Sequence, residues 1–158
     1  MKTRNMVGAF LICNDKALFM RRSLNKKIAP GKWSCVGGHI EPDEMNNPAI
    51  ACFREIEEET GIAKEQIKNL RLRYVTTRYT GEELRTGYYF FGEVERICPL
   101  PYCSEGELYW LNISDISEKE MSFSVKKIME HWLSNPLDEA MYLCGINRAN
   151  DEMTWTEL

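Results

Sequence analysis

The sequence has little histidine and no closely paired cysteines. Its 158 residues include only two histidines, His39 and His131, and six cysteines, none in a Cys-x-x-Cys pair. A structural zinc site takes about four nitrogen or sulfur ligands at short, recognisable spacing. The sequence therefore argues against a zinc domain, and we expect free thiols in a reducing compartment.

The chain also lacks an excess of positive charge and any long apolar run. Its formal net charge is −4, whereas broad nucleic-acid binding needs a basic face. No apolar run approaches the roughly 20 residues of a membrane span, and Asn14, Asp15 and Lys16 interrupt the short run near the N-terminus. We expect a cytoplasmic monomer or homodimer with neither a nucleic-acid polymer nor a membrane as partner. A small anionic substrate stays compatible with this charge, because a bound metal ion reverses the field of an acidic site.

What is present is the composition of one folded domain. Hydrophobic residues make up 44% of the chain and charged residues 28%. The apolar patterns predict helices over 48–60 and 123–133, strands over 7–13, 17–20, 33–36, 70–79, 88–94 and 108–111, and a C-terminal β-hairpin extension at about 138–157. Because strand follows strand more often than helix follows strand, we expect a single α+β domain over residues 1–158, with a mixed sheet between helices.

The clearest helix start lies at Asn47 and Pro48. Asn47 suits the N-cap, and Pro48 suits the first helical position, where its missing N–H costs nothing. Apolar residues follow at helical spacing. Gly61 then suits a left-handed C-cap, so a helix is predicted between these signals.

Three carboxylates share one face of this predicted helix. Glu55, Glu58 and Glu59 are spaced i, i+3 and i+4, whereas Glu57 is rotated away from them. Carboxylates crowded in this way repel one another unless a cation neutralises them, and hard oxygen donors suit Mg²⁺. Arg54 can orient a neighbouring carboxylate. The alternative is a solvated acidic face, and these residues alone leave both readings open.

The segment from Gly38 to Ile62 resembles the Nudix box, whose pattern is G-x5-E-x7-R-E-U-x-E-E-x-G-U with U apolar. Gly38 and Glu44 stand in the G-x5-E relation, and Arg54-Glu55-Ile56, Glu58-Glu59 and Gly61-Ile62 match the second half without a gap. Nine residues rather than seven separate Glu44 from Arg54, so we place the two extra residues in the loop at Met45-Asn46. The resemblance covers about residues 5–133 and implies the Nudix fold, an α/β/α sandwich.

The resemblance also implies a mechanism, the Mg²⁺-dependent hydrolysis of a pyrophosphate bond, with Mn²⁺ as a substitute ion. Glu58 and Glu59 would bind the metal together with the Gly38 carbonyl. Glu55 would share the metal shell or act as the base. The remaining implied roles are that Arg54 orients Glu55 and that Glu44 supports the metal shell.

Further site residues are predicted outside the box. Glu105 precedes the strand 108–111 and resembles a loop glutamate that reaches the metal site of MutT-type members from the opposite wall. Trp33 and Phe123 could each stack on a base, although each is also a plausible core residue. Arg22, in a basic loop, is the third candidate for substrate contact.

The box sets the reaction but not the substrate. The chain looks most like the MutT-type group, which acts on nucleoside triphosphates and on oxidised purine nucleotides such as 8-oxo-dGTP, giving a nucleoside monophosphate and pyrophosphate. Dinucleoside polyphosphates are an alternative, since Tyr79 lies where their hydrolases tend to place a tyrosine. Coenzyme A is another, because Arg22 and Gly31 fit part of an upstream motif. A non-catalytic nucleotide-binding regulator and an isomerase using Cys35 are the alternatives from other classes.

Overall fold

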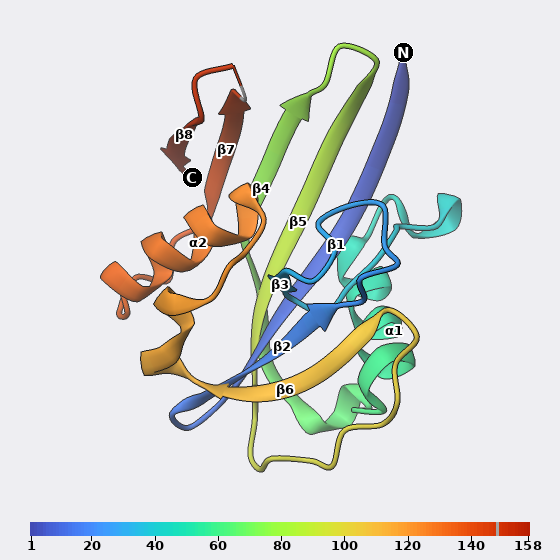
Figure 1. Cartoon of the computed structure of the whole chain (residues 1–158), viewed down its shortest axis with the longest axis vertical. Helices are drawn as coiled ribbons and strands as arrows, with labels where there is room; N and C mark the ends of the chain where they lie inside the picture. The colour runs from blue at the N-terminus through green and yellow to red at the C-terminus, as the bar shows by residue number, and fades with distance from the viewer. Residues whose placement is uncertain (148) are drawn as a thin grey trace.

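A computed structural model of residues 1–158 describes every residue except residue 148. A long, twisted mixed sheet runs through the centre of the molecule (Figure 1). Its strands are β1 (Lys2–Cys13), β2 (Lys16–Arg22), β3 (Trp33–Ser34), β4 (Ile67–Tyr79), β5 (Glu83–Val94), β6 (Gly106–Asn112), β7 (Tyr142–Asn147) and β8 (Glu152–Glu157). They lie in the order β3-β2-β1-β5-β4-β7-β8, and β6 pairs with β2. The pairs β1–β5 and β4–β7 are parallel and the others antiparallel, so the expected mixed sheet is confirmed.

Helices cover both faces of this sheet, as Figure 1 shows for α1 (Pro48–Thr60) and α2 (Phe123–Ser134). Side chains of β1 alternate between the two faces. Ala9 and Leu11 pack in the hydrophobic cluster that includes residues of α1, whereas Phe10 packs in the cluster that includes residues of α2. The short 3₁₀ helices are η1 (Pro42–Glu44), η2 (Lys64–Gln66) and η3 (Ile113–Glu118). The expected sheet between helices is therefore correct.

The signals that predict α1 are local, and the helix has the predicted bounds. Pro48 is its first residue, and Gly61 ends it in the left-handed conformation with φ 72°, its N–H donating to the Glu57 carbonyl. Asn47 occupies the N-cap position, but its side chain makes no capping hydrogen bond. The Asn47 side chain therefore does not cap the N-terminus of α1.

The main differences from the predicted elements are the starts of β1 and β5. β1 begins at Lys2, not at Val7, and β5 begins at Glu83, not at Tyr88. The polar first half of β5 pairs with β4 on one side and β1 on the other. Register with two neighbouring strands, rather than apolar content, holds this half in the sheet.

The C-terminal hairpin is a continuation of the sheet. β7 lies parallel to β4, and β8 lies antiparallel to β7 at the edge of the sheet. Trp155 of β8 stacks on His131 of α2 with ring centroids 4.6 Å apart, and the Tyr74 hydroxyl lies 2.9 Å from His131 Nδ1. The hairpin is therefore packed against α2. Among the described residues, no helix has the length and apolar character needed to cross a membrane.

Candidate active site

The buried carboxylate of α1 lies against a glycine turn. Glu59 is only 7% exposed, and the Gly37 N–H donates to its Oε2 at 2.8 Å. Gly37 has φ 145°, and a Cβ there would lie 2.1 Å from the Val7 carbonyl oxygen, so this position requires glycine. Burial raises the pKa of Glu59 to about 7; the Gly37 N–H opposes that shift, while Glu55 and Glu105 reinforce it.

The next glycine makes room for a second carboxylate. A Cβ on Gly38 would lie 2.5 Å from Glu55 Oε1, so the Glu55 carboxylate occupies the space that a side chain would fill. The Gly38 carbonyl, a predicted metal ligand, accepts a hydrogen bond from the Val7 N–H at 2.9 Å. Glu58, by contrast, has a side chain that is 59% exposed. The shared helix face thus presents two carboxylates to the glycine turn and one to solvent.

Arg54 connects three of the four acidic side chains that we call the carboxylate cluster, namely Glu44, Glu55, Glu58 and Glu59. Its Nε and Nη2 each donate to the Glu44 carboxylate at 2.8 Å, and Nη1 donates to Glu55 at 2.8 Å and to Glu58 at 3.3 Å. The bonds from Arg54 hold the pKa of Glu44 at about 2. The predicted contact between Arg54 and Glu55 is therefore present.

Glu44 reaches this cluster through the turn η1. Its Oε2 accepts a hydrogen bond from the Glu41 N–H at 3.0 Å, which fixes the carboxylate from the other end. Met45 and Asn46 form an exposed turn between η1 and α1. With these two residues in the turn, Glu44 is still buried and still bonded to Arg54.

The carboxylate cluster suits a hard cation by charge and donor chemistry. Four carboxylates against one guanidinium leave negative charge uncompensated, and carboxylate and carbonyl oxygens are the donors that Mg²⁺ takes in proteins. In the described part of the chain, no three His, Cys, Asp or Glu side chains converge in metal-binding geometry. Arg54 bonds to Glu55 and Glu58 in this arrangement.

A cleft on the α2 side of the sheet extends to this glycine turn. Its volume is about 200 Å³, and its lining includes Gly37 together with Arg22, Arg78 and Arg85. Arg22 donates from Nε to the Ile28 carbonyl at 3.0 Å, and its charge lowers the pKa of Glu59 against the larger effect of burial. The cleft is thus basic in a protein of net charge −4.

Two of the predicted substrate contacts lie elsewhere. Trp33 packs against Tyr109, with ring centroids 5.2 Å apart, and Lys119 lies 5.4 Å from the Trp33 ring centroid. Ser122, Ser124 and Val125 are the residues near the start of α2 that line the cleft, whereas neither Trp33 nor Phe123 does. The expectation that either ring stacks on a base in this cleft therefore receives no support from its position.

Glu105 lies on the loop before β6, as the sequence predicts, and its charge acts on Glu59 from there. Its carboxylate pairs with Lys26 Nζ at 2.6 Å and is 42% exposed. Glu107 bonds to the Tyr109 hydroxyl. The two loop glutamates thus have different partners, which makes Glu107 a matched control for Glu105.

Sequence reasoning missed the floor of the cleft. Tyr89 lies across two glycines, because a Cβ on Gly8 or on Gly87 would come within 3.0 or 2.9 Å of its ring. Thr76 and Ser124 hydrogen-bond to Tyr89. Only strand register brings these residues together, although Gly8, within a predicted strand, is a signal for close approach of another group.

Cys35 is a packed residue of this cleft. Its Sγ would lie 2.6 Å from a Cβ on Gly8, and burial raises the pKa of its thiol to about 12. A thiol with so high a pKa is not a nucleophile near neutral pH. The geometry therefore disfavours the isomerase alternative.

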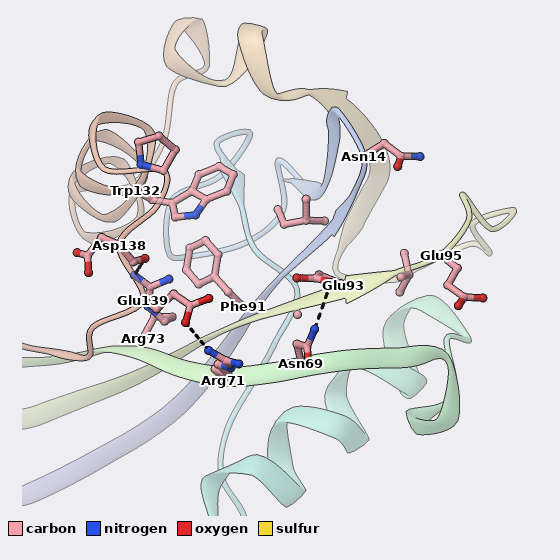
Figure 2. Close-up of a pocket in the computed structure, with 14 residues that line it drawn as sticks. Asn14, Asn69, Arg71, Arg73, Phe91, Glu93, Glu95, Trp132, Asp138 and Glu139 are labelled. Carbon is pink, nitrogen blue, oxygen red and sulfur yellow. Dashed lines mark hydrogen bonds and ion pairs between the residues drawn. The ribbon is translucent and has the colours of Figure 1, made fainter.

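A larger cavity of about 440 Å³ lies away from α1, between the end of α2 and the strands β4 and β5 (Figure 2). Its charged groups have partners within the protein. Arg71 pairs with Glu139 at 2.9 Å, and Arg73 donates to the Ala140 carbonyl at 2.8 Å and to the Asp138 carbonyl. This cavity contains no residue of the carboxylate cluster.

The fold and the site together define an α/β/α protein in which α1 and the preceding turn η1 carry a carboxylate cluster beside a basic cleft. The family model described as NUDIX domain matches residues 2–132. The chain belongs to the NUDIX family, and the resemblance drawn from the box is confirmed.

Solved structures support the fold. The MutT protein of Bacillus halodurans is 21% identical, with a TM-score of 0.68 over 98% of this chain and 97% of that chain. The NUDIX domain of Shewanella oneidensis NrtR, solved with ADP ribose, is 15% identical, with a TM-score of 0.69 over 86% of this chain and 90% of that chain. The expected Nudix fold is therefore confirmed.

Among curated proteins, Nudix hydrolase 25 of Arabidopsis thaliana is 39% identical over 64 residues. The match covers 40% of this chain and 34% of that protein, so the chain spans about a third of the length of this curated relative.

Proposed function

We propose that the protein is a Mg²⁺-dependent pyrophosphohydrolase that acts on a nucleoside triphosphate, including oxidised purine nucleotides such as 8-oxo-dGTP. It would release a nucleoside monophosphate and pyrophosphate. One observation carries the proposal: the buried Glu59 carboxylate is held by Gly37, and Gly37 also lines a cleft that contains three arginines. A metal-binding carboxylate and cations for the phosphates thus lie at one place.

The side chains have separable roles in this proposal. Glu58, Glu59 and the Gly38 carbonyl would hold Mg²⁺ or Mn²⁺, and a metal bound there would neutralise charge that develops on the phosphate chain. Glu55 takes the proton of the attacking water. Arg54 keeps the Glu55 carboxylate oriented through the 2.8 Å bond. Arg22 binds a phosphate oxygen from the cleft side.

Glu105 is the second candidate base. Its carboxylate acts on Glu59 from the loop before β6, and Gly106 follows it at the start of the strand. Since general-base help is typically worth about 10²–10⁴ in rate, the two candidates are separable by mutation.

A substrate panel with Mg²⁺ tests the proposal. The panel contains dGTP, 8-oxo-dGTP, diadenosine tetraphosphate, coenzyme A and ADP-ribose, the last because a related NUDIX domain was solved with it. We expect the triphosphates to be cleaved fastest, with pyrophosphate as co-product and no turnover in EDTA. Faster cleavage of another member would reassign the substrate. Nucleotide binding without cleavage of any member would instead indicate a non-catalytic regulator.

A further inference from the structure

Three arginines lie side by side across the sheet at the N-terminal end of β5. Arg85 is in register with Arg4 of β1 on one side and with Arg78 of β4 on the other. Residues in register present their side chains on the same face, about 4.5–5.5 Å apart at Cβ in an antiparallel pair. We call Arg4, Arg85 and Arg78 the arginine row. Because β1 places its even-numbered residues on the α2 face at Phe10, the row lies on that face as well.

Placing like charges directly opposite one another destabilises a sheet. One internal anion offsets part of this cost, since Glu83 bonds to Arg85 and lies 3.6 Å from Arg4 Nε. The Arg4 and Arg85 guanidinium groups share this one carboxylate, so the pair keeps a net positive charge. This local positive charge lies in a protein whose formal net charge is −4.

The row lies at a defined distance from the carboxylate cluster. Gly37 contacts Val7 of β1, whereas Arg85 is in register with Arg4, three residues further along the same strand. Three residues of strand span about 10 Å. Arg78, Arg85 and Gly37 all line the same cleft, so one ligand can contact both ends.

The floor between the two ends is uncharged. It consists of Met6, Gly87 and Thr76, which are in register on β1, β5 and β4, followed by the ring of Tyr89. The cleft lining includes the hydroxyl-bearing residues Ser34, Ser122, Ser124 and Thr76. An uncharged, hydroxyl-lined surface with a flat ring suits a nucleoside, whose ribose and base are uncharged but form hydrogen bonds.

We infer that this cleft binds a nucleotide carrying a second phosphate on its ribose, with that phosphate held by Arg78 and Arg85. The inference rests on the proposed function, which places the 5′-phosphates at the carboxylate cluster. It adds a second anion site at the opposite end of the nucleoside. Arginine suits such a site because its planar guanidinium forms two parallel hydrogen bonds to phosphate oxygens.

A binding measurement tests the inference without any need for hydrolysis. Titration calorimetry compares AMP with adenosine 3′,5′-bisphosphate and adenosine 2′,5′-bisphosphate on the wild-type protein. We expect one bisphosphate to bind at least about tenfold more tightly than AMP, since hydrogen bonds to charged groups contribute at least this much. The better isomer identifies the position of the phosphate. Equal affinity of AMP and both bisphosphates would overturn the inference.

Variants locate the site. Arg78→Gln and Arg85→Gln should each reduce the preference for the bisphosphate, and Glu83→Gln should increase it by removing the internal counter-charge. Arg71→Gln is the matched control, because it removes one positive charge from β4 outside this cleft. Loss of preference in Arg71→Gln, or an unchanged preference in both Arg78→Gln and Arg85→Gln, would overturn the assignment to the row.

Hydrolysis separates this inference from the proposed function. Coenzyme A and dephospho-coenzyme A differ only in a ribose 3′-phosphate, and kcat/KM for the two is compared with Mg²⁺. If the 3′,5′-bisphosphate is the tighter isomer, a higher value for coenzyme A that falls in Arg85→Gln supports the anion site and pyrophosphohydrolase activity, while the preference for triphosphates is tested by the substrate panel. A bisphosphate preference in calorimetry without cleavage of any nucleotide supports the anion site and refutes the proposed function.

Discussion

The carboxylate cluster and the arginine row are charged groups of opposite sign. In the cluster, Arg54 bonds to three of the four carboxylates, and in the row, the Glu83 carboxylate contacts Arg4 and Arg85. The two sites differ in burial. Glu44 and Glu59 are buried, whereas the Arg4 and Arg85 side chains are 31% and 34% exposed. We expect the buried Glu44 and Glu59 to contribute to the fold as well as to the proposed function, and the partly exposed arginine row to contribute mainly to binding.

The largest expected effect is loss of turnover when the cluster loses a metal-binding carboxylate. Glu58→Gln or Glu59→Gln should lower kcat by at least about 100-fold, because several kcal/mol of transition-state stabilisation depend on the bound metal. Steady-state rates and Mg²⁺ titration measure the effect. Glu57→Gln is the control, since Glu57 is exposed and outside the cluster. Similar losses at all three positions would contradict the shared-face argument.

A second large effect is expected in stability when the cluster loses its cation. Arg54→Gln leaves four carboxylates close together, including the buried Glu44, and should lower Tm by roughly 5 °C or more in the absence of metal. The double variant Arg54→Gln/Glu44→Gln should recover part of this loss, because the buried charge is then gone. Thermal unfolding followed by circular dichroism measures both. A Tm within a degree of the wild type would show that Arg54 has no structural role.

A smaller effect on turnover is expected in the loop that faces the cluster. Glu105→Gln should lower kcat at least about tenfold if Glu105 acts as the base or completes the metal shell. Glu107→Gln should stay within about threefold of the wild type, because Glu107 bonds to Tyr109 instead. Single-turnover rates measure both variants. The reverse order would transfer the role to Glu107, and two silent variants would leave Glu55 as the base.

The smallest effect is expected in the stability of the arginine row. Arg78→Gln should change Tm by less than about 2 °C, in the stabilising direction, because it removes one of two like charges that face each other. The change should shrink further in about 1 M salt, where exposed charges are screened. Unfolding curves at low and high salt measure it. A Tm lower than that of the wild type by more than about 5 °C would show that the row stabilises the ligand-free fold as well as offering a binding site.

The sequence predicted local structure well, whereas contacts between segments that are distant in the sequence could not be predicted. The bounds of α1 and the shared face of Glu55 and Glu59 follow from helical spacing, Pro48 and Gly61, all within one segment. The bond from Arg54 to Glu44 could not be predicted from the sequence, because it depends on how η1 turns the chain before the helix. The box gave Glu44 only a supporting role, without its partner.

The arginine row was missed for a different reason. The predicted strand began at Tyr88, where the apolar residues begin, and so left out Arg85. Register between Arg78 and Arg85 is a property of two strands and a turn, and polar strand ends carry no periodic signal of their own. Trp33 and Phe123 do not line the cleft, and their spacing in the sequence does not show which way the chain turns their rings.

The parallel pairing of β1 with β5 has a consequence for synthesis of the chain. Lys2 lies beside Glu83 and Ile12 beside Glu93, with α1 and β4 between these strands in sequence. Such long-range contacts slow folding, because a large loop must close before any contact forms. On the ribosome, α1 emerges while β1 still lacks this neighbour. A nascent or truncated chain that ends before Glu83 leaves one edge of β1 open, and an open strand edge is where intermolecular pairing begins.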